Sequence, residues 1–316
     1  MIDFENILKF SQKELYSWLR NMYRKKAVCC KGSYILVPGE APIMLIAHLD
    51  TVHKEPVREI CRSHNGNIIM SPQGIGGDDR CGVFALLCVY NTAKRKPWLL
   101  FTCDEEVGGI GAKVFSKHYR AGKLPKRIND LKLLVEIDRK GNNDAVYYNC
   151  ANDDLETYIT SKGYETDWGS YSDISTIAPE LGVAAVNLSS GYYNAHTLHE
   201  YINLEHLNST IGRVSEIVAE ASQRDFPRYE YISAPIHSGR GLGWHGCFGY
   251  TKMSSSDSEL NHIPPEIRNE YEELLDYYTA SELDFIREEY GDMMILEMYD
   301  NEIELYCGYD YGSNKR

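Results

Sequence analysis

The sequence lacks an apolar run long enough to cross a bilayer, which takes about 20 residues. Its first residues, Met1 to Asn6, carry acids before any base and have no hydrophobic core of a secretion signal. Nine cysteines, an odd number at irregular spacings, make neither a disulfide framework nor a zinc-ribbon pattern. These absences predict a cytoplasmic, non-secreted protein that has no membrane contact.

Positive charge is also scarce. The 316 residues include 46 Asp and Glu against 33 Lys and Arg, a net charge of −13, which argues against a nucleic-acid partner. Residues 263–316 hold 15 acidic and 4 basic residues, so −11 of that charge lies there. We therefore predict a main domain over 1–225, a linker or long loop over 226–262 and an acidic C-terminal element over 263–316.

Apolar runs and helical periodicities alternate along the main domain. The runs predict strands at 33–37, 43–47, 98–102, 131–137, 145–149 and 183–188, and Asn65–Gly66 predicts a hairpin. Spacings of three to four predict helices over 4–26, 83–94, 111–119, 153–162 and 204–222, and another after Ser172–Asp173. This alternation predicts an α/β three-layer sandwich with a mixed, mostly parallel sheet. In the acidic element we predict a small α+β unit, with helices over 264–278 and 281–290 and a hairpin over 293–307.

Residues able to bind metals follow the predicted strands or occupy the turns between them. In chain order they are His48 with Asp50, Asp78 beside Asp79, Glu105 with Glu106, Asp138, and His196. A lone Glu–Glu pair is most often a solvated acidic turn. Together, however, these residue types suit a two-zinc site, where a carboxylate bridges ions about 3.5–4 Å apart.

Five motifs carry a resemblance to a known family. They are Ala47-His48-Leu49-Asp50-Thr51-Val52, Gly77-Asp78-Asp79-Arg80-Cys81-Gly82, Asp104-Glu105-Glu106-Val107-Gly108-Gly109, Ile137-Asp138 and Asn194-Ala195-His196-Thr197-Leu198-His199-Glu200-Tyr201. In this order they make the chain similar to the co-catalytic zinc exopeptidases of clan MH. That group includes peptidase T, carboxypeptidase G, acyl-amino-acid hydrolases and bacterial di-zinc aminopeptidases.

The resemblance implies a ligand set for two zinc ions per chain, with cobalt or manganese as substitutes. His48, Asp78 and Asp138 would hold one ion. The second ion would be held by Glu106 and His196, together with the same Asp78 as the bridge.

The resemblance also implies the residues around the metals. Asp50 would accept a hydrogen bond from the ring of His48, and Glu105 would be the general base. A cis peptide usually follows the bridging aspartate, here between Asp78 and Asp79. Four points stay open: Asp79 as the bridge, His199 as the ligand, surface roles for His53, His64 and His206, and a pocket or N-cap role for Ser172–Asp173.

The spacing between motifs departs from several relatives. Only 30 residues separate His48 from Asp78, and 58 separate Asp138 from His196, so neither gap holds a lid domain. We therefore expect a lidless catalytic domain over 1–225. Because the lid of carboxypeptidase-type relatives helps to bind the substrate carboxylate, its absence favours an aminopeptidase.

The resemblance implies a metallo-exopeptidase in which a hydroxide between two zinc ions attacks a peptide bond. One alternative is an amidohydrolase, deacylase or carboxypeptidase acting on N-acyl amino acids. A mononuclear transferase, as in the glutaminyl cyclases, fits the full ligand set less well. An alternative of another class is a peptidase-like binding protein acting through its acidic C-terminal element. That element would cover the cleft, form a homo-oligomer, dock a basic protein partner, or simply pack as a solvated appendage.

Overall fold

The structure is a computed structural model that describes residues 3–169 and 171–234 and ten positions between 263 and 295. The chain divides into two compact units, Met1–Pro235 and Ile236–Arg316. The first unit continues past the predicted boundary at 225, because Phe226 and Tyr229 are buried in its core. Among the described residues, no helix is both long and apolar enough to cross a membrane.

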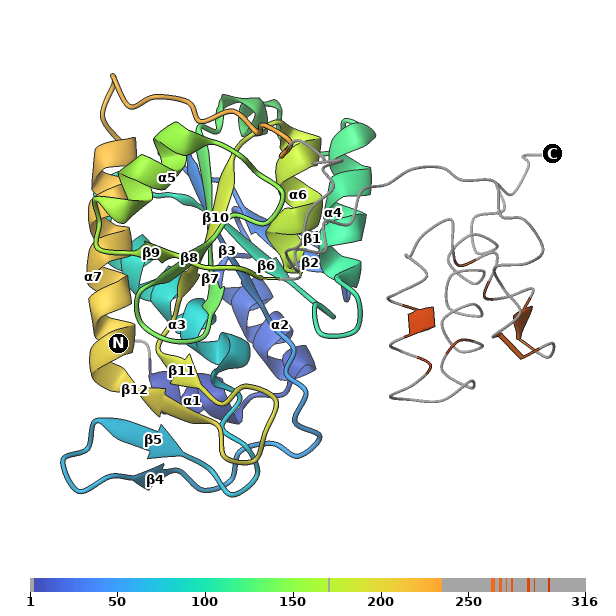
Figure 1. The fold of residues 1–316 in the computed structure, drawn as a ribbon, viewed down its shortest axis with the longest axis vertical. Coiled ribbons are helices and arrows are strands. Elements are labelled where there is room, and N and C mark those ends of the chain that lie inside the picture. The colour runs from blue at the N-terminus through green and yellow to red at the C-terminus, as the bar shows by residue number, and fades with distance from the viewer. Residues whose placement is uncertain are drawn as a thin grey trace, which may run out of the picture. The chain divides into compact units, whose positions relative to one another are not determined.

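An eight-stranded sheet forms the centre of the first unit (Figure 1). Its strands, in spatial order, are β1 (Val28–Cys30), β2 (Tyr34–Val37), β6 (Trp98–Thr102), β3 (Ile43–His48), β7 (Leu133–Arg139), β10 (Ala185–Ser189), β8 (Asp144–Val146) and β9 (Glu165–Thr166). The four strands β6, β3, β7 and β10 are parallel, whereas β1, β2 and β8 make antiparallel pairs. The mixed, mostly parallel sheet confirms the predicted α/β class.

The central strands are apolar along their whole length because helices cover both faces of the sheet. Successive side chains alternate between faces, and Leu45 and Ala47 join one hydrophobic cluster while Met44 and Ile46 join the other. Buried residues of α1 (Phe4–Lys9), α2 (Gln12–Met22), α3 (Gly77–Thr92), α5 (Asp153–Thr160) and α7 (Leu204–Ala221) belong to the first cluster. Those of α4 (Ile110–Arg120), α6 (Asp173–Leu181) and the 3-10 turn η1 (Lys126–Asp130) belong to the second. The three predicted layers are therefore present.

Two local features differ from the prediction. The expected helix over 4–26 is interrupted, because Ser11 adopts an extended backbone and caps α2 in a capping box with Glu14. A second sheet, in the order β11 (Tyr192–Tyr193), β12 (Tyr201–Asn203), β5 (Ile68–Met70) and β4 (Cys61–Arg62), was not predicted. The predicted hairpin at Asn65–Gly66 is confirmed, since β4 and β5 pair antiparallel around it.

Most of the predicted helices and hairpin after residue 263 lie outside the described residues. Within the second unit, the described apolar side chains are all buried; they are Ile263, Ile267, Tyr271, Leu274, Leu283 and Ile295. The first four recur at helical spacing, and Tyr271 donates a hydrogen bond of 2.7 Å from its hydroxyl to Asp284. The described part of the acidic element thus includes an amphipathic segment with buried apolar positions.

Candidate metal centre

The carboxyl ends of three neighbouring parallel strands bring the predicted ligands to one edge of the sheet. His48 is the last residue of β3, Asp138 lies near the end of β7, and Glu105 with Glu106 follow β6. Open α/β sheets bind ligands at this edge. His48 is 1% exposed, so its ring is fixed by the packing around it.

Asp78 lies between the two histidines. It enters the first turn of α3 after Gly76, whose left-handed backbone redirects the chain, and the peptide between Asp78 and Asp79 is cis, as expected. Its Oδ1 is 3.0 Å from Nε2 of His48, and its Oδ2 is 3.3 Å from Nε2 of His196. One carboxylate therefore points a separate oxygen at each imidazole.

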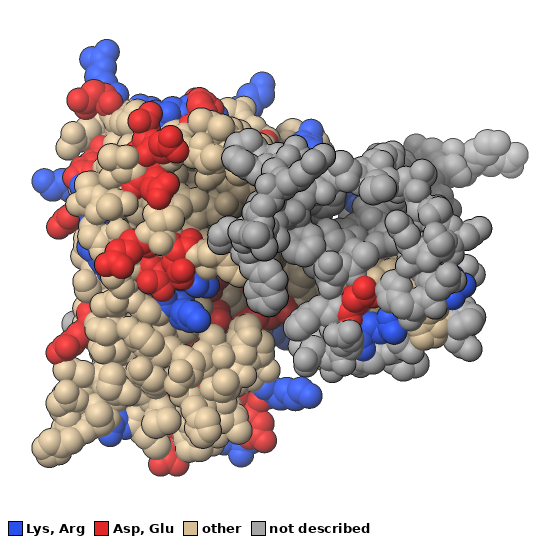
Figure 2. All heavy atoms as spheres, viewed as in Figure 1, with Lys and Arg blue, Asp and Glu red and all other residues tan. Residues whose placement is uncertain are grey.

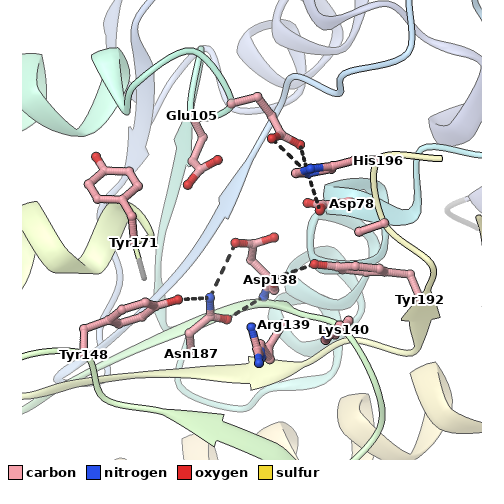
Figure 3. A pocket seen from close by; sticks show the side chains of 12 residues that line it. Asp78, Glu105, Asp138, Arg139, Lys140, Tyr148, Tyr171, Asn187, Tyr192 and His196 are labelled. Atoms are coloured by element: carbon pink, nitrogen blue, oxygen red, sulfur yellow. Dashed lines mark hydrogen bonds and ion pairs between the residues drawn. The ribbon is translucent and has the colours of Figure 1, made fainter. Parts of the chain in front are cut away.

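The remaining ligand candidates complete two adjacent groups, of whose members Figure 3 labels Asp78, Asp138 and His196. Oδ1 of Asp138 is 3.3 Å from Nε2 of His48, and Oε2 of Glu106 is 3.1 Å from Nε2 of His196. One set of three, His48, Asp78 and Glu106, has donor atoms within 4.8 Å of one another, and a second set joins His48 and Asp138 with Asp79. The structure thus brings together all five residues that the sequence analysis named as ligands.

The chemistry of these donors fits a cation. Oδ1 of Asp138 is buried and has no hydrogen-bond partner. Burial and the charge of Asp78 raise the pKa of Asp138 to about 8, and the charge of His48 opposes this shift only in part. Imidazole nitrogen with carboxylate oxygen is the donor set typical of zinc.

Asp50 connects one imidazole to the loop that carries the glutamates. Its Oδ1 lies 3.3 Å from Nδ1 of His48. Its two oxygens also accept hydrogen bonds from the backbone N–H groups of Glu105, at 3.1 Å, and Glu106, at 3.0 Å. Burial alone would raise the pKa of Asp50, but the contact with His48 and these backbone donors lower it below its ordinary value. Asp50 therefore stays ionised as an acceptor.

The two open ligand choices differ clearly in geometry. Asp79 is fully buried, and its oxygens accept from the backbone N–H groups of Gly82, at 2.8 Å, and His48, at 3.3 Å. Although Asp79 lies close to His48 and Asp138, it does not line the cavity, whereas Asp78 does. His196 and His199 are both exposed, but Nε2 of His196 lies 3.3 Å from Asp78 and 3.1 Å from Glu106. The geometry favours Asp78 and His196.

Glu105 faces a cavity of about 270 Å³ beside these groups. Burial is the main cause that holds its pKa well above the ordinary value; the charge of His48 opposes the shift and that of Asp138 adds to it. A carboxylate whose pKa is raised above its ordinary value holds a proton more readily, as a group that accepts and returns a proton requires.

Several cavity residues escaped the sequence analysis. They are Arg139, Lys140, Tyr148, Tyr171, Asn187 and Tyr192. Asn187 accepts from the backbone N–H of Asp138 at 2.9 Å and donates to its Oδ2 at 3.4 Å, while the Tyr192 hydroxyl donates to the Asp138 carbonyl at 2.8 Å. The one available signal was Asn187 itself, a polar residue inside an apolar strand run.

Two further buried residues, Glu200 and Ser172, make hydrogen bonds next to the site without lining the cavity. Glu200 is fully buried, and its carboxylate accepts from Nε2 of His53 at 2.7 Å and from the backbone N–H groups of Gly76 and Asp78, both at 3.0 Å. His53 thus has a structural role. Ser172 begins α6, and its hydroxyl donates to buried Glu136 without lining the cavity.

Comparison with solved structures identifies the fold. Aminopeptidase PepT from Bacillus cereus matches with a TM-score of 0.54 and 14% identity, over 70% of this chain and 97% of that one. The chain has the fold of a co-catalytic zinc exopeptidase. An aminopeptidase from the archaeon Desulfurococcus kamchatkensis gives 0.54 and 14%, over 69% and 93% of the two chains. The TET1 peptidase of Pyrococcus horikoshii gives 0.50 and 14%, over 68% and 99%. Neither a protein-family model nor a curated protein sequence matches the chain.

The described residues of the two intervals between the ligand motifs form no separate domain. Between His48 and Asp78 the chain forms only the short β4–β5 hairpin and its flanking loops. Between Asp138 and His196 it forms β8, β9 and β10 of the central sheet, α5 and α6 beside them, and the short β11. The described residues of both intervals therefore belong to elements of the first unit.

Proposed function

We propose that this chain is a metal-dependent exopeptidase, and specifically an aminopeptidase. The observation that carries the proposal is the Asp78 carboxylate, with one oxygen 3.0 Å from His48 and the other 3.3 Å from His196. A carboxylate between two imidazoles is the arrangement needed to bridge two metal ions. The shared fold of the aminopeptidase neighbours supports the choice of reaction.

Two zinc ions, or cobalt or manganese in their place, would use the five ligands in two overlapping sets. His48, Asp138 and Oδ1 of Asp78 would hold one ion. Glu106 and His196 would hold the other, with Oδ2 of Asp78. When bound, such ions polarise the scissile carbonyl and lower the pKa of water.

The protein's own groups would then handle protons and orientation. Glu105 would take a proton on its carboxylate from the attacking water and return it to the nitrogen of the leaving amine. Asp50 would hold the ring of His48 at Nδ1 and would accept a hydrogen bond from the backbone N–H of Glu105. The candidate ligand His48 and the candidate base Glu105 would therefore keep a fixed position relative to each other.

The setting of the reaction is also part of the proposal. The seven described cysteines are all free, which is in keeping with a reducing cytoplasm. We expect a homo-oligomer, because the structurally similar TET1 peptidase of Pyrococcus horikoshii can assemble into a tetrahedron or a large octahedral shell. The substrate would be a short peptide or a related amide.

The test is metal content by plasma mass spectrometry on full-length protein purified without chelator, with a panel of aminoacyl anilides and short peptides. We expect two ions per chain and hydrolysis that a chelator abolishes. Glu105→Gln should keep both ions and lower kcat by about 100-fold or more. The matched change Glu106→Gln should instead lower metal content. Turnover by Glu105→Gln at the wild-type rate would refute the mechanism, and one ion or none without hydrolysis would refute the function.

A further inference from the structure

Two basic side chains line the cavity on the side away from the glutamates. Arg139 is the last residue of β7 and Lys140 follows it. In Figure 3 both lie across Asp138 from Glu105. The cavity therefore has an acidic, metal-binding wall and a basic wall.

Hydrogen bonds hold the Arg139 side chain in place, but not all of its N–H groups have an acceptor. Its Nη2 donates to Oδ2 of Asp167 at 2.6 Å and to the carbonyl of Trp168 at 3.0 Å. Its Nε is buried and has no hydrogen-bond partner. A buried N–H without an acceptor is costly, and because this N–H has almost no solvent contact, a ligand acceptor would reach it after a small shift of the side chain that lines the cavity.

Lys140 supplies a second positive charge at the rim. Its backbone is anchored, because its carbonyl accepts from the Ser189 hydroxyl at 2.6 Å, but its side chain is exposed. No acidic group among the described residues makes an ion pair with it. Burial raises the pKa of Asp144 and the hydrogen bond from Arg139 lowers that of Asp167, and the charge of Lys140 only acts to lower both pKa values. On the face of the first unit that Figure 2 turns to the viewer, acidic and basic side chains lie together near the middle.

The charge balance of the cavity points to an anionic ligand. Four carboxylates line it, those of Asp78, Glu105, Glu106 and Asp138, and two divalent cations would offset all four. Asp167 offsets Arg139, so the charge of Lys140 and the free Nε–H of Arg139 are left over. A volume of about 270 Å³ is just below the small end of the range for small-molecule sites, about 300–1,000 Å³, and suits a short peptide.

We propose that Arg139 and Lys140 bind a carboxylate of the substrate. This inference rests on the proposed function and narrows its substrate class to peptides with an anionic group near the scissile bond. The carboxylate is either the free C-terminus of a dipeptide or tripeptide or an acidic side chain. An arginine with an unused N–H beside a lysine is well suited to either source.

The experiment compares substrates that differ in one carboxylate. Zinc-loaded, full-length enzyme is assayed with trialanine and its C-terminal amide, and with glutamyl anilide and glutaminyl anilide. We expect the acid in one pair to have a kcat/KM higher by about tenfold or more, as a charge-assisted contact provides. A preference in the first pair identifies the C-terminus, and one in the second identifies a side chain.

Variants then assign the preference to the two residues. Lys140→Met should reduce it about fivefold, mainly through KM, and Lys140→Arg should restore it. Arg139→Met should abolish it, with thermal unfolding as a check because Arg139 also holds Asp167. Lys94→Met is the matched control, since Lys94 is exposed beyond the end of α3 opposite to Asp78.

The proposal fails if neither pair shows a preference, or if the preference persists in both Lys140→Met and Arg139→Met. Failure of the peptidase function gives a different result, namely no hydrolysis of any substrate by any variant. In that case calorimetry of trialanine and its amide with the wild-type protein still decides the matter. Tighter binding of the acid that Lys140→Met removes supports the carboxylate site, and equal binding overturns it.

Discussion

Replacing Asp50 by Asn tests the connection between the metal ligand and the base. Two backbone N–H groups donate to this 8% exposed carboxylate, those of Glu105 at 3.1 Å and Glu106 at 3.0 Å, and Nδ1 of His48 lies 3.3 Å from it. An asparagine has the same shape but only one acceptor oxygen. In either orientation its NH₂ group faces at least one of these N–H groups.

The size of the effect follows from that mismatch. A buried donor left without an acceptor costs about 1–3 kcal/mol, so Asp50→Asn should lower the unfolding free energy of the metal-free protein by that amount. The ring of His48 also loses its orienting carboxylate, and loss of such a partner weakens metal binding about 10- to 100-fold. Stability and metal affinity should therefore fall together.

Urea denaturation in the presence of chelator measures the first effect, and competition with a chromogenic chelator measures the second. Asp104→Asn is the matched control. Asp104 lies in the same loop, accepts from Gln12 at 2.7 Å and has a φ of 59°, a backbone conformation that asparagine adopts readily. If Asp50→Asn matches Asp104→Asn in both assays, Asp50 does not couple the ligand to the loop.

Two other substitutions probe the support of Asp78. Glu200→Ala removes the acceptor of two backbone N–H groups, those of Gly76 and Asp78. We expect the free energy of unfolding, measured by urea denaturation, to fall by about 2–4 kcal/mol, and metal content to fall with it. Unchanged metal content would show that Glu200 is not needed to hold Asp78 in place. Gly82→Ala would put a Cβ 2.2 Å from the Ile137 carbonyl oxygen, so we expect the free energy of unfolding to fall by about 3 kcal/mol or more. The control Gly212→Ala, where the Cβ meets no atom within 4 Å, should leave stability unchanged or raise it. Equal stability of the two variants would contradict the close packing of α3 on β7.

The ligands were predictable because each follows a local pattern. An apolar run ends and a polar residue comes next, as at His48 after β3 and Asp138 at the end of β7. Parallel strands then collect these ends at one edge without any further information. The class of the fold was predictable for the same reason, since strands buried on both faces have continuous apolar sequences.

The supporting residues were not predictable because their partners are distant in sequence. Asn187 meets Asp138 only because β10 lies next to β7, with Asn187 opposite Glu136 in the register. Glu200 and Asp78 are 122 residues apart, yet their contact orients the candidate bridge. Such contacts depend on the order of strands in the sheet and on the path of a loop. The periodicity of residues within one segment gives no information about either.

The described residues of the two intervals between the ligand motifs form no lid domain, so the groups of the first unit that line the cavity come from loops and strand ends at the edge of the sheet. Arg139 and Lys140 are suited to contacting a substrate because they directly follow Asp138, so their backbone is fixed by the same strand that positions this candidate ligand. Their distance from the scissile bond is then set by β7, and a carboxylate bound there would fix the length of peptide that the enzyme accepts.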